Sequence, residues 1–312
     1  MLEIRVPATS ANLGSGLDSL GLALSLYLKL TYASQPSLII EPLGDGADEL
    51  PRNKDNLIWK TADRFYREMT GRTIPSGHLT VSSHIPLSRG LGSSAAAVVA
   101  GLLLANALLP EPLSRERLLH TATAIEGHPD NVAAALFGGF VLVYQDYQQI
   151  IRVRNYPPPD LECLLAIPPY PVPTKDSRAV LPLQVPRDDA IFNAQRVALW
   201  IHAVSQRDWS VLRDAADDRL HQSYRTTLVE GLDDLIYASY EAGASAATLS
   251  GSGPTVMALS EKNHVDSILQ RWTTVAHRYD WPLTVRHVRL VGPGAQVKHI
   301  YPVNHEVAAS DD

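Results

Sequence analysis

The stretch Pro86–Ala96, PLSRGLGSSAA, decides how the rest of this chain is interpreted. A strand-like run leads into it, and an alanine-rich apolar run that is typical of a buried helix follows it. Gly90 and Gly92 allow the backbone to come close to a ligand. The first N–H groups of a helix have no acceptor inside the helix and lie at its positive end, where Ser93 and Ser94 add hydroxyl groups. The stretch is therefore predicted to bind an anion, and phosphate in particular.

A dinucleotide-binding loop and a plain turn are the alternatives for this stretch. Gly90, Gly92 and Ala95 match the pattern GxGxxA, whereas the GxxxxGK[ST] pattern of a Walker loop does not occur in the chain. Against a dinucleotide, the next expected element is a second helix over 114–126 instead of the strand that a βαβ unit requires, and the nearby acidic residue Glu111 lies between two prolines. A strand–helix turn with a serine cap needs fewer glycines and serines than are present.

The composition is that of a globular protein. The 312 residues are 45% hydrophobic and 19% charged, which excludes a disordered chain and suffices for about two domains. The net charge of −6, with no long basic run, argues against a nucleic-acid or anionic-membrane partner. The single cysteine, Cys163, is expected to be a buried core thiol. The N-terminus lacks a signal-peptide pattern, and the longest apolar stretch, 95–109, is too short to span a bilayer, so a cytoplasmic location is expected.

Three consecutive prolines, Pro157–Pro159, mark the best domain boundary, because they disfavour regular structure and suit a stiff connector. They divide the chain into domains over 1–157 and 158–312, and the last residues, 305–312, are expected to fray. Strands are expected at 2–6, 22–32, 78–85, 140–144, 161–168 and 283–290, with a strand–turn–strand unit over 246–259. Helices are expected at 56–70, 95–109, 114–126, 131–136, 189–204, 208–221, 235–242 and 264–279.

Two further loops combine glycine with small polar residues. Residues 7–21, PATSANLGSGLDSLG, hold Asn12 and Asp18 among glycines. Residues 248–255, TLSGSGPT, hold two glycines and a proline between apolar strands. Taken alone, each loop fits a binding site for a small polar ligand and equally fits a capped or tight turn.

The three loops together, in this order, resemble the three motifs of the GHMP small-molecule kinases. The first loop and the downstream segment 126–139, EGHPDNVAAALFGG, are similar to the homoserine kinase branch of that superfamily. The chain reads SGLDS where PGFDS is expected, which keeps the aspartate and the glycine before it. The resemblance implies an α+β enzyme of two domains. The N-terminal domain has a mixed sheet and a phosphate-binding helix, and the C-terminal domain is a ferredoxin-like α/β sandwich.

The activity implied by the resemblance is ATP-dependent phosphorylation of the terminal hydroxyl of L-homoserine to O-phospho-L-homoserine, a step of threonine biosynthesis. A kinase acting on threonine, shikimate or mevalonate is the alternative, and a non-catalytic binding protein with the same fold is a second one. Homodimers are common in the superfamily, so a homodimer is included among the expectations.

The resemblance also assigns the nucleotide side of the site. Asn56 and Leu57 correspond to residues beside the adenosine, and Ser250, Gly251, Ser252 and Gly253 form the third loop. The residues that match the superfamily's magnesium ligands are Ser94, or Ser93, and Glu126. For Glu126, a surface carboxylate at a helix end is the alternative. The ATP-binding residues implied by the second motif are Pro86, Leu87, Ser88, Arg89, Gly90, Leu91, Gly92, Ser93, Ser94, Ala95 and Ala96.

The acceptor side follows from the same resemblance and from the charges of an amino acid. The ammonium of homoserine needs a carboxylate, and Asp18 with Asn12 is available. Its carboxylate suits a two-pronged arginine, for which Arg178 and Arg225 correspond to the family's substrate arginines. The remaining assignments are His128 as a third substrate contact, Thr174 near the γ-phosphate, and Asp130 and Asn131 as catalytic residues. Whether the last two supply a base, orient the site or only begin a helix stays open.

Overall fold

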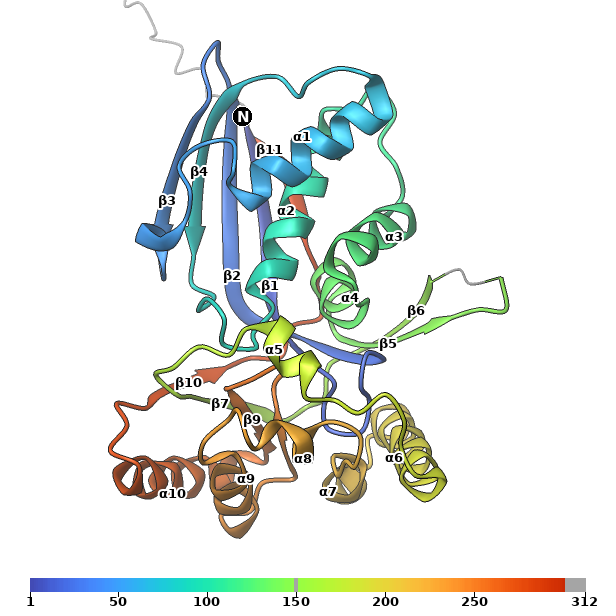
Figure 1. Cartoon of the computed structure of the whole chain (residues 1–312), viewed down its shortest axis with the longest axis vertical. Helices are drawn as coiled ribbons and strands as arrows, with labels where there is room; N and C mark the ends of the chain where they lie inside the picture. The colour runs from blue at the N-terminus through green and yellow to red at the C-terminus, as the bar shows by residue number, and fades with distance from the viewer. Residues whose placement is uncertain (149–150, 301–312) are drawn as a thin grey trace, which may run out of the picture.

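The computed structural model describes residues 1–148 and 151–300, and these form two halves stacked along the long axis of the molecule (Figure 1). The residues 305–312, expected to fray, lie outside the described part. One half is built on a seven-stranded sheet and the other on a four-stranded sheet. Within the described residues, no helix combines the length and the apolar character that crossing a membrane requires.

The first sheet has the order β11-β1-β2-β4-β3, and β5 adds to β2 and carries β6. All its pairs are antiparallel except β3 with β4, so the sheet is mixed, as predicted. Its strands are β1 (Leu2–Ala11), β2 (Leu20–Ser34), β3 (Ile39–Gly44), β4 (Gly77–Ser83), β5 (Phe140–Gln145), β6 (Ile151–Tyr156) and β11 (Gln296–His299).

Four helices lie on one face of this sheet: α1 (Leu57–Thr70), α2 (Ser93–Ala107), α3 (Arg115–Glu126) and α4 (Asp130–Phe137). Helix α2 is apolar all round, and every residue from Val98 to Asn106 is buried, because sheet strands and the other helices surround it. The apolar run that follows the loop 86–92 is thus the central helix of this half.

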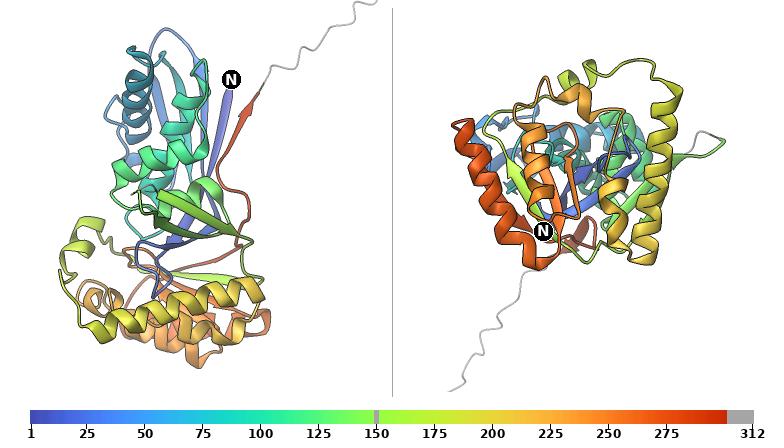
Figure 2. Two further views of the ribbon diagram at one scale, coloured as in Figure 1. Left: turned by 90° about the vertical axis from the view of Figure 1, so that its right-hand side faces the viewer. Right: turned by 90° about the horizontal axis from the view of Figure 1, so that it is seen from below.

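The second sheet has the antiparallel order β10-β7-β9-β8, made by β7 (Glu162–Ile167), β8 (Ala246–Leu249), β9 (Val256–Ser260) and β10 (Thr284–Val288). Helices follow β7 and β9 along the chain, while β8 leads directly into β9. The longer helices lie below this sheet in the left view of Figure 2 and side by side in front of it in the right view. Strand order and chain order together are those of a ferredoxin-like sandwich, which confirms the prediction. The helices of this half are α5 (Thr174–Ala179), α6 (Arg187–Gln206), α7 (Leu212–Ala215), α8 (Gln222–Arg225), α9 (Leu232–Glu241) and α10 (Val265–Arg278).

Several elements differ from the sequence prediction for local physical reasons. Strand β1 continues through Pro7, because a register shift between Pro7 and Ala8 removes the need for a ladder hydrogen bond from the proline. Strands β3 and β6 and helix α5 were not predicted, and the helix expected over 208–221 is reduced to a 3₁₀ turn and the four-residue α7. Cys163 is a free, buried thiol, as predicted, and burial raises its pKa above the usual range.

The end of the described chain returns to the first half. Strand β11 pairs with β1, with Leu2 opposite His299 and Arg5 opposite Gln296. Figure 2 shows the two strands running together along the back of the molecule. The domain boundary between residues 157 and 158 stays a prediction. Strand β11, which belongs to the first sheet, comes from the part of the chain after this boundary.

Candidate active site

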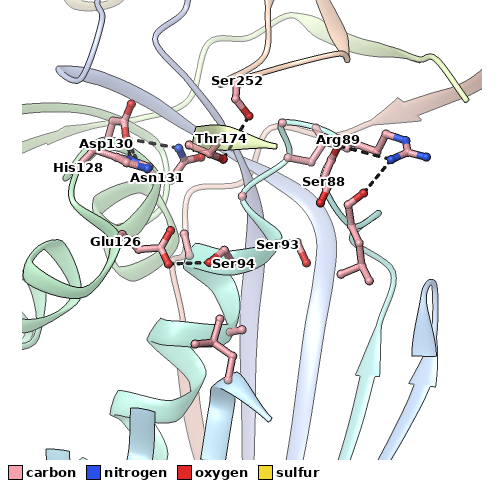
Figure 3. Close-up of a pocket in the computed structure, with 18 of the residues that line it drawn as sticks. Ser88, Arg89, Ser93, Ser94, Glu126, His128, Asp130, Asn131, Thr174 and Ser252 are labelled. Carbon is pink, nitrogen blue, oxygen red and sulfur yellow. Dashed lines mark hydrogen bonds and ion pairs between the residues drawn. The ribbon is translucent and has the colours of Figure 1, made fainter. Parts of the chain in front are cut away.

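A cavity of about 340 Å³ lies where the two halves meet, and all three glycine-containing loops or their flanks reach it. Figure 3 shows its walls: the start of α2 at the centre, Glu126 and the His128–Asn131 segment on one side, and Ser88 and Arg89 on the other. The lining residues are Asn12, Glu49, Leu50, Leu57, Leu87, Ser88, Arg89, Gly90, Leu91, Gly92, Ser93, Ser94, Ala95, Ala97, Glu126, His128, Asp130, Asn131, Thr174, Arg178, Arg225, Gly251 and Ser252.

The start of α2 forms the anion-binding end of the cavity. Gly92 is the N-cap in the left-handed conformation, with φ of 71°, and no side chain caps the helix. The backbone N–H groups of Ser93, Ser94 and Ala95 form no hydrogen bond within the described residues. These donors and the helix dipole together favour a phosphate at this position. The helix begins at Ser93, two residues earlier than predicted, so both serines belong to its first turn.

The third loop acts as a brace behind the second loop. The hydroxyl of Ser250 donates to the carbonyl oxygen of Gly90 at 2.7 Å, and a Cβ atom at Gly90 would lie 2.1 Å from the carbonyl oxygen of Ser250. Helix α5 docks on the same loop, since the hydroxyl of Ser177 donates to the carbonyl oxygen of Ser252 at 3.1 Å. The two loops therefore hold each other by backbone approach, which only glycine at position 90 permits.

Ser94 and Glu126 lie side by side at the edge of this anion site. The Ser94 hydroxyl donates to Oε1 of Glu126 at 2.7 Å, from the first turn of α2 to the last residue of α3 (Figure 3). A hydroxyl and a carboxylate are hard oxygen ligands, and magnesium is typically bound by one or two such groups together with nucleotide phosphates and water. The described residues contain no group of three or more His, Cys, Asp and Glu side chains suited to a metal, which fits an ion held mainly by the nucleotide. This pair fits the implied metal.

The end of the cavity lined by Arg178 and Arg225 is its charged end. Two predicted substrate residues, Asp18 and Arg178, pair with each other there. Arg178 of α5 donates Nη1 to Oδ2 of Asp18 at 3.2 Å and Nη2 to Oδ1 at 2.5 Å. Asp18 belongs to the first loop and does not line the cavity itself, whereas Arg178 does. The hydrogen bond and charge of Asp18 raise the pKa of Arg178. Asp18 was expected to be free for an ammonium group, and the structure instead gives it a guanidinium partner.

Arg225 is the second cation of this end, and it differs from Arg178 in its surroundings. Its side chain is only 2% exposed. Its Nε donates to the carbonyl oxygen of Ser177, and its Nη1 donates to Nδ1 of His221 and to the carbonyl oxygen of Gly251. Burial and the charge of Arg178 lower the pKa of Arg225 to about 10. No carboxylate lies within hydrogen-bond distance of its guanidinium among the described residues, so the cavity holds a buried cation that lacks an anionic partner.

His128, Asp130 and Asn131 form a connected group at the start of α4. Oδ1 of Asp130 is 2.9 Å from Nδ1 of His128 and accepts the backbone N–H of Asn131 at 2.7 Å. Thr9 of β1 donates its hydroxyl to Oδ1 of Asn131 at 2.8 Å. Because Oδ1 is used as an acceptor, the amide presents its Nδ2 group as a donor. Burial lowers the pKa of His128, but the hydrogen bond and charge of Asp130 prevail and raise it.

Some predicted residues lie behind the cavity instead of on its wall. Asn56 caps α1 by accepting the N–H of Ile58 and donating to the carbonyl oxygen of Pro51, and Ala96 is fully buried in the core. Pro86, Ser250 and Gly253 also do not line it. Sequence reasoning missed Glu49, Leu50 and Ala97 on the wall and Thr9 behind Asn131. The turn-forming segment 44–51, GDGADELP, was the available signal for the first two.

Comparison with known proteins agrees with this geometry. The family "GHMP kinases N terminal domain" matches residues 56–139, and "GHMP kinases C terminal" matches residues 200–277. Homoserine kinase of Carboxydothermus hydrogenoformans is 43% identical over 263 residues, which are 84% of this chain and 86% of that protein. Homoserine kinase of Moorella thermoacetica is 44% identical over 257 residues, 82% of this chain and 86% of that protein.

Solved structures give the same answer. The crystal structure of homoserine kinase from Cytophaga hutchinsonii matches with a TM-score of 0.82 and 29% identity, covering 95% of this chain and 97% of that one. A Streptococcus pneumoniae phosphomevalonate kinase, with a TM-score of 0.68 and 16% identity, shares the fold. With both halves matched and relatives above 40% identity over most of the chain, this protein belongs to the GHMP kinases and, within them, to the homoserine kinase family.

Proposed function

We propose that this protein transfers the γ-phosphoryl group of ATP to the terminal hydroxyl of L-homoserine, giving O-phospho-L-homoserine and ADP in threonine biosynthesis. One observation carries the proposal: a single cavity joins a helix N-terminus with free N–H groups to two arginines, Arg178 and Arg225, and Arg178 holds the Asp18 carboxylate next to the cavity. The first end suits a triphosphate, and the second suits a zwitterion that carries a hydroxyl.

The chain's own residues perform positioning and charge neutralisation, which is most of what phosphoryl transfer requires. The N–H groups of Ser93, Ser94 and Ala95 hold phosphate oxygens at the start of α2. Ser94 and Glu126 would hold magnesium, which when bound neutralises charge on the phosphates. Thr174, whose hydroxyl lies 3.5 Å from that of Ser252, is positioned to contact the γ-phosphate.

Asn131 and Asp130 are assigned orienting roles. Asp130 is 2% exposed, and its Oδ1 lies 2.9 Å from Nδ1 of His128 and accepts the backbone N–H of Asn131, so this oxygen holds the start of α4 in place. Asn131 donates its Nδ2 group to the acceptor hydroxyl oxygen. That oxygen bonds to the γ-phosphorus while the bond from phosphorus to the β–γ bridging oxygen breaks, and the hydroxyl proton passes to a phosphate oxygen.

Two finer expectations complete the proposal. We infer a cytoplasmic location, since the substrate and ATP are metabolites of that compartment, and a homodimer, since dimers are common in the superfamily. Light scattering on the purified protein tests the second expectation, because a single species with the mass of one 34.1 kDa chain contradicts it.

The test of the activity is ADP release by the purified protein with homoserine, threonine, shikimate and mevalonate as acceptors. We expect turnover with homoserine to exceed that with shikimate or mevalonate by at least about a hundredfold in kcat/KM, since a site that pairs two substrate charges rejects acceptors lacking one of them. Mevalonate has no ammonium group. Preference for mevalonate or shikimate would overturn the proposal, and binding of ATP without turnover of any acceptor would favour a non-catalytic protein.

Ser94→Ala and Glu126→Gln are each expected to lower turnover at limiting magnesium by at least about tenfold, because the first removes an oxygen ligand and the second replaces a charged carboxylate by a neutral amide. The homoserine KM should change little, as neither residue lies at the charged end of the cavity. Initial rates are measured against magnesium concentration at saturating ATP. If raising the magnesium concentration does not restore any activity to one of these variants, the residue changed in it is not a magnesium ligand.

Asp18→Asn tests the charged end of the cavity, because the variant should phosphorylate homoserine more slowly and 4-hydroxybutyrate faster than the wild type. Removing the carboxylate is expected to lower kcat/KM for homoserine by about ten- to hundredfold, since a hydrogen bond to a charged group is worth about 1.5–3 kcal/mol. It also frees Arg178 from its ion pair, so 4-hydroxybutyrate, which has the carboxylate and lacks the ammonium, should be phosphorylated better by the variant than by the wild type. An equal loss for both acceptors would make Asp18 a structural residue.

A further inference from the structure

His221 is a buried histidine that no part of the proposed reaction uses directly. It precedes α8, its side chain is fully buried, and it does not line the cavity. Its two ring nitrogens nevertheless contact both substrate-binding elements of the charged end. Nδ1 is 3.0 Å from Nη1 of Arg225, and Nε2 is 2.7 Å from the carbonyl oxygen of Gly14, in the loop that carries Asn12 and Asp18.

These two contacts determine where the imidazole carries its proton. A guanidinium group only donates, so Nδ1 of His221 accepts from Arg225 and bears no proton. The Gly14 carbonyl only accepts, so Nε2 bears the proton and donates it. The ring is therefore neutral, with its proton on Nε2. Burial and the positive charge of Arg225 act in the same direction by lowering the pKa of His221, against the opposing charge of Asp218.

Asp218 fixes the backbone that presents this ring. Its Oδ2 accepts the N–H groups of His221 at 2.9 Å and Gln222 at 2.7 Å, and its Oδ1 accepts the N–H of Leu220 at 3.0 Å and Nδ2 of Asn193 at 2.7 Å. The carboxylate thus satisfies three successive backbone donors and the Asn193 side chain, which ties the turn before α8 to helix α6.

The contact with His221 also determines which N–H donors of Arg225 remain available for a ligand. Nε is used by the carbonyl oxygen of Ser177 and Nη1 by His221 and the carbonyl oxygen of Gly251. Nη2 has no hydrogen-bond partner in the part of the chain that the structure describes, and the residue lines the cavity. The guanidinium is thus held through Nε and Nη1, and Nη2 is available to a ligand.

We propose that His221 is a positioning residue for the acceptor: as a neutral ring it holds Arg225 with Nη2 toward the cavity and ties it to the loop that carries Asn12 and Asp18. The proposal rests on the proposed function, in which Arg225 binds the homoserine carboxylate. A neutral acceptor suits this task better than a carboxylate, since an anion here would neutralise the guanidinium and weaken its attraction for the substrate.

Two substitutions separate the two contacts. In His221→Asn the amide ends where Nδ1 lies, so an oxygen acceptor for Arg225 is kept and the donor to Gly14 is lost. In His221→Gln the amide reaches the position of Nε2, so the donor to Gly14 is kept and the acceptor for Arg225 is lost. Ser239→Ala is the matched control, because it removes a buried hydrogen bond, with Nε1 of Trp272 at 2.9 Å, far from the cavity.

The readouts are KM and kcat for homoserine, the KM for ATP, and turnover of 3-aminopropan-1-ol, which has the ammonium and hydroxyl of homoserine and no carboxylate. We expect His221→Gln to raise the homoserine KM by about tenfold or more with kcat and the ATP KM nearly unchanged, and His221→Asn to raise it by less than about threefold. Turnover of 3-aminopropan-1-ol should respond to neither, and Ser239→Ala should lower the melting temperature without moving any kinetic constant.

A lower melting temperature for His221→Gln with an unchanged homoserine KM would show that His221 is only structural. Imidazole ¹⁵N NMR of the wild type, assigned by the signal missing in His221→Gln, is independent of the acceptor. A neutral ring protonated on Nε2 at neutral pH supports the proposal, and a proton on Nδ1 overturns it. Failure of the wild type to phosphorylate homoserine, with the NMR result as expected, would count against the proposed function and leave the arrangement of His221 and Arg225 intact.

Discussion

Arg225→Lys is expected to lower kcat/KM for homoserine by about a hundredfold or more. Lysine keeps the charge but cannot reach Ser177, His221 and Gly251 at once while also presenting donors to a carboxylate. Disrupting a buried, hydrogen-bonded charge contact costs about 2–5 kcal/mol, and about 1.4 kcal/mol corresponds to a factor of ten. The loss should fall mainly on the homoserine KM, measured by initial rates at saturating ATP.

Arg178→Lys provides the comparison for this variant. Arg178 is half-exposed and already paired with Asp18, so its replacement should raise the homoserine KM less than that of Arg225. Melting temperatures of both variants show whether either has lost its fold. Wild-type kcat/KM in Arg225→Lys would mean that this buried arginine is structural and that the carboxylate binds elsewhere.

Gly92→Val is expected to abolish detectable phosphorylation by removing the geometry of the anion site. Gly92 has φ of 71°, and a Cβ atom there would lie 2.0 Å from Oγ1 of Thr9 and 3.1 Å from Oδ1 of Asn131. The added side chain must therefore shift either the first turn of α2, proposed to bind phosphate, or the Thr9–Asn131 hydrogen bond, proposed to orient the acceptor. We expect at least about a thousandfold loss of kcat/KM, because either shift moves one part of the proposed site relative to the other.

The control for backbone strain is Gly71→Val at the end of α1. Gly71 has φ of 70°, and a Cβ atom there would meet nothing within 4 Å. It matches the conformation of Gly92 without the steric contact, so it should lose stability and keep full activity. Nucleotide affinity of Gly92→Val is measured by calorimetry on the folded fraction, and near-normal affinity would remove this glycine from the phosphate site.

Much of the fold was predictable from local pattern. Helix α1 begins after Asn56 and ends at Gly71, because an asparagine cap and a left-handed glycine are local signals that tertiary contacts did not override. Strands β3 and β6 were missed for the opposite reason. Both lie at the periphery of the first sheet and bury little: β3 contains a proline and two buried residues, and β6 has no buried residue, although its sequence IRVR alternates apolar and polar side chains.

The phosphate site was the part of the function that sequence alone could locate. Its donors are the consecutive backbone N–H groups of residues 93–95, so glycine, serine and an apolar helix in a row determine it. The pairing of Ser94 with Glu126 also followed from motif position, 32 residues apart, and the structure brings the two side chains into contact.

The acceptor site was decided only by the tertiary structure. The Asp18–Arg178 pair joins residues 160 positions apart, and the contact of His221 with Gly14 spans 207 positions. Motif resemblance named Asp18 and Arg178 but not their pairing, and it named neither His221 nor Gly14, since it carries no information on which groups meet in the unliganded chain. Sequence by itself determined a GHMP kinase with a phosphate loop, because those features are local. The packing of the first loop and the start of α8 around His221 decided which donors of Arg225 are used within the described chain, because hydrogen-bond geometry depends on distances that only the folded chain sets.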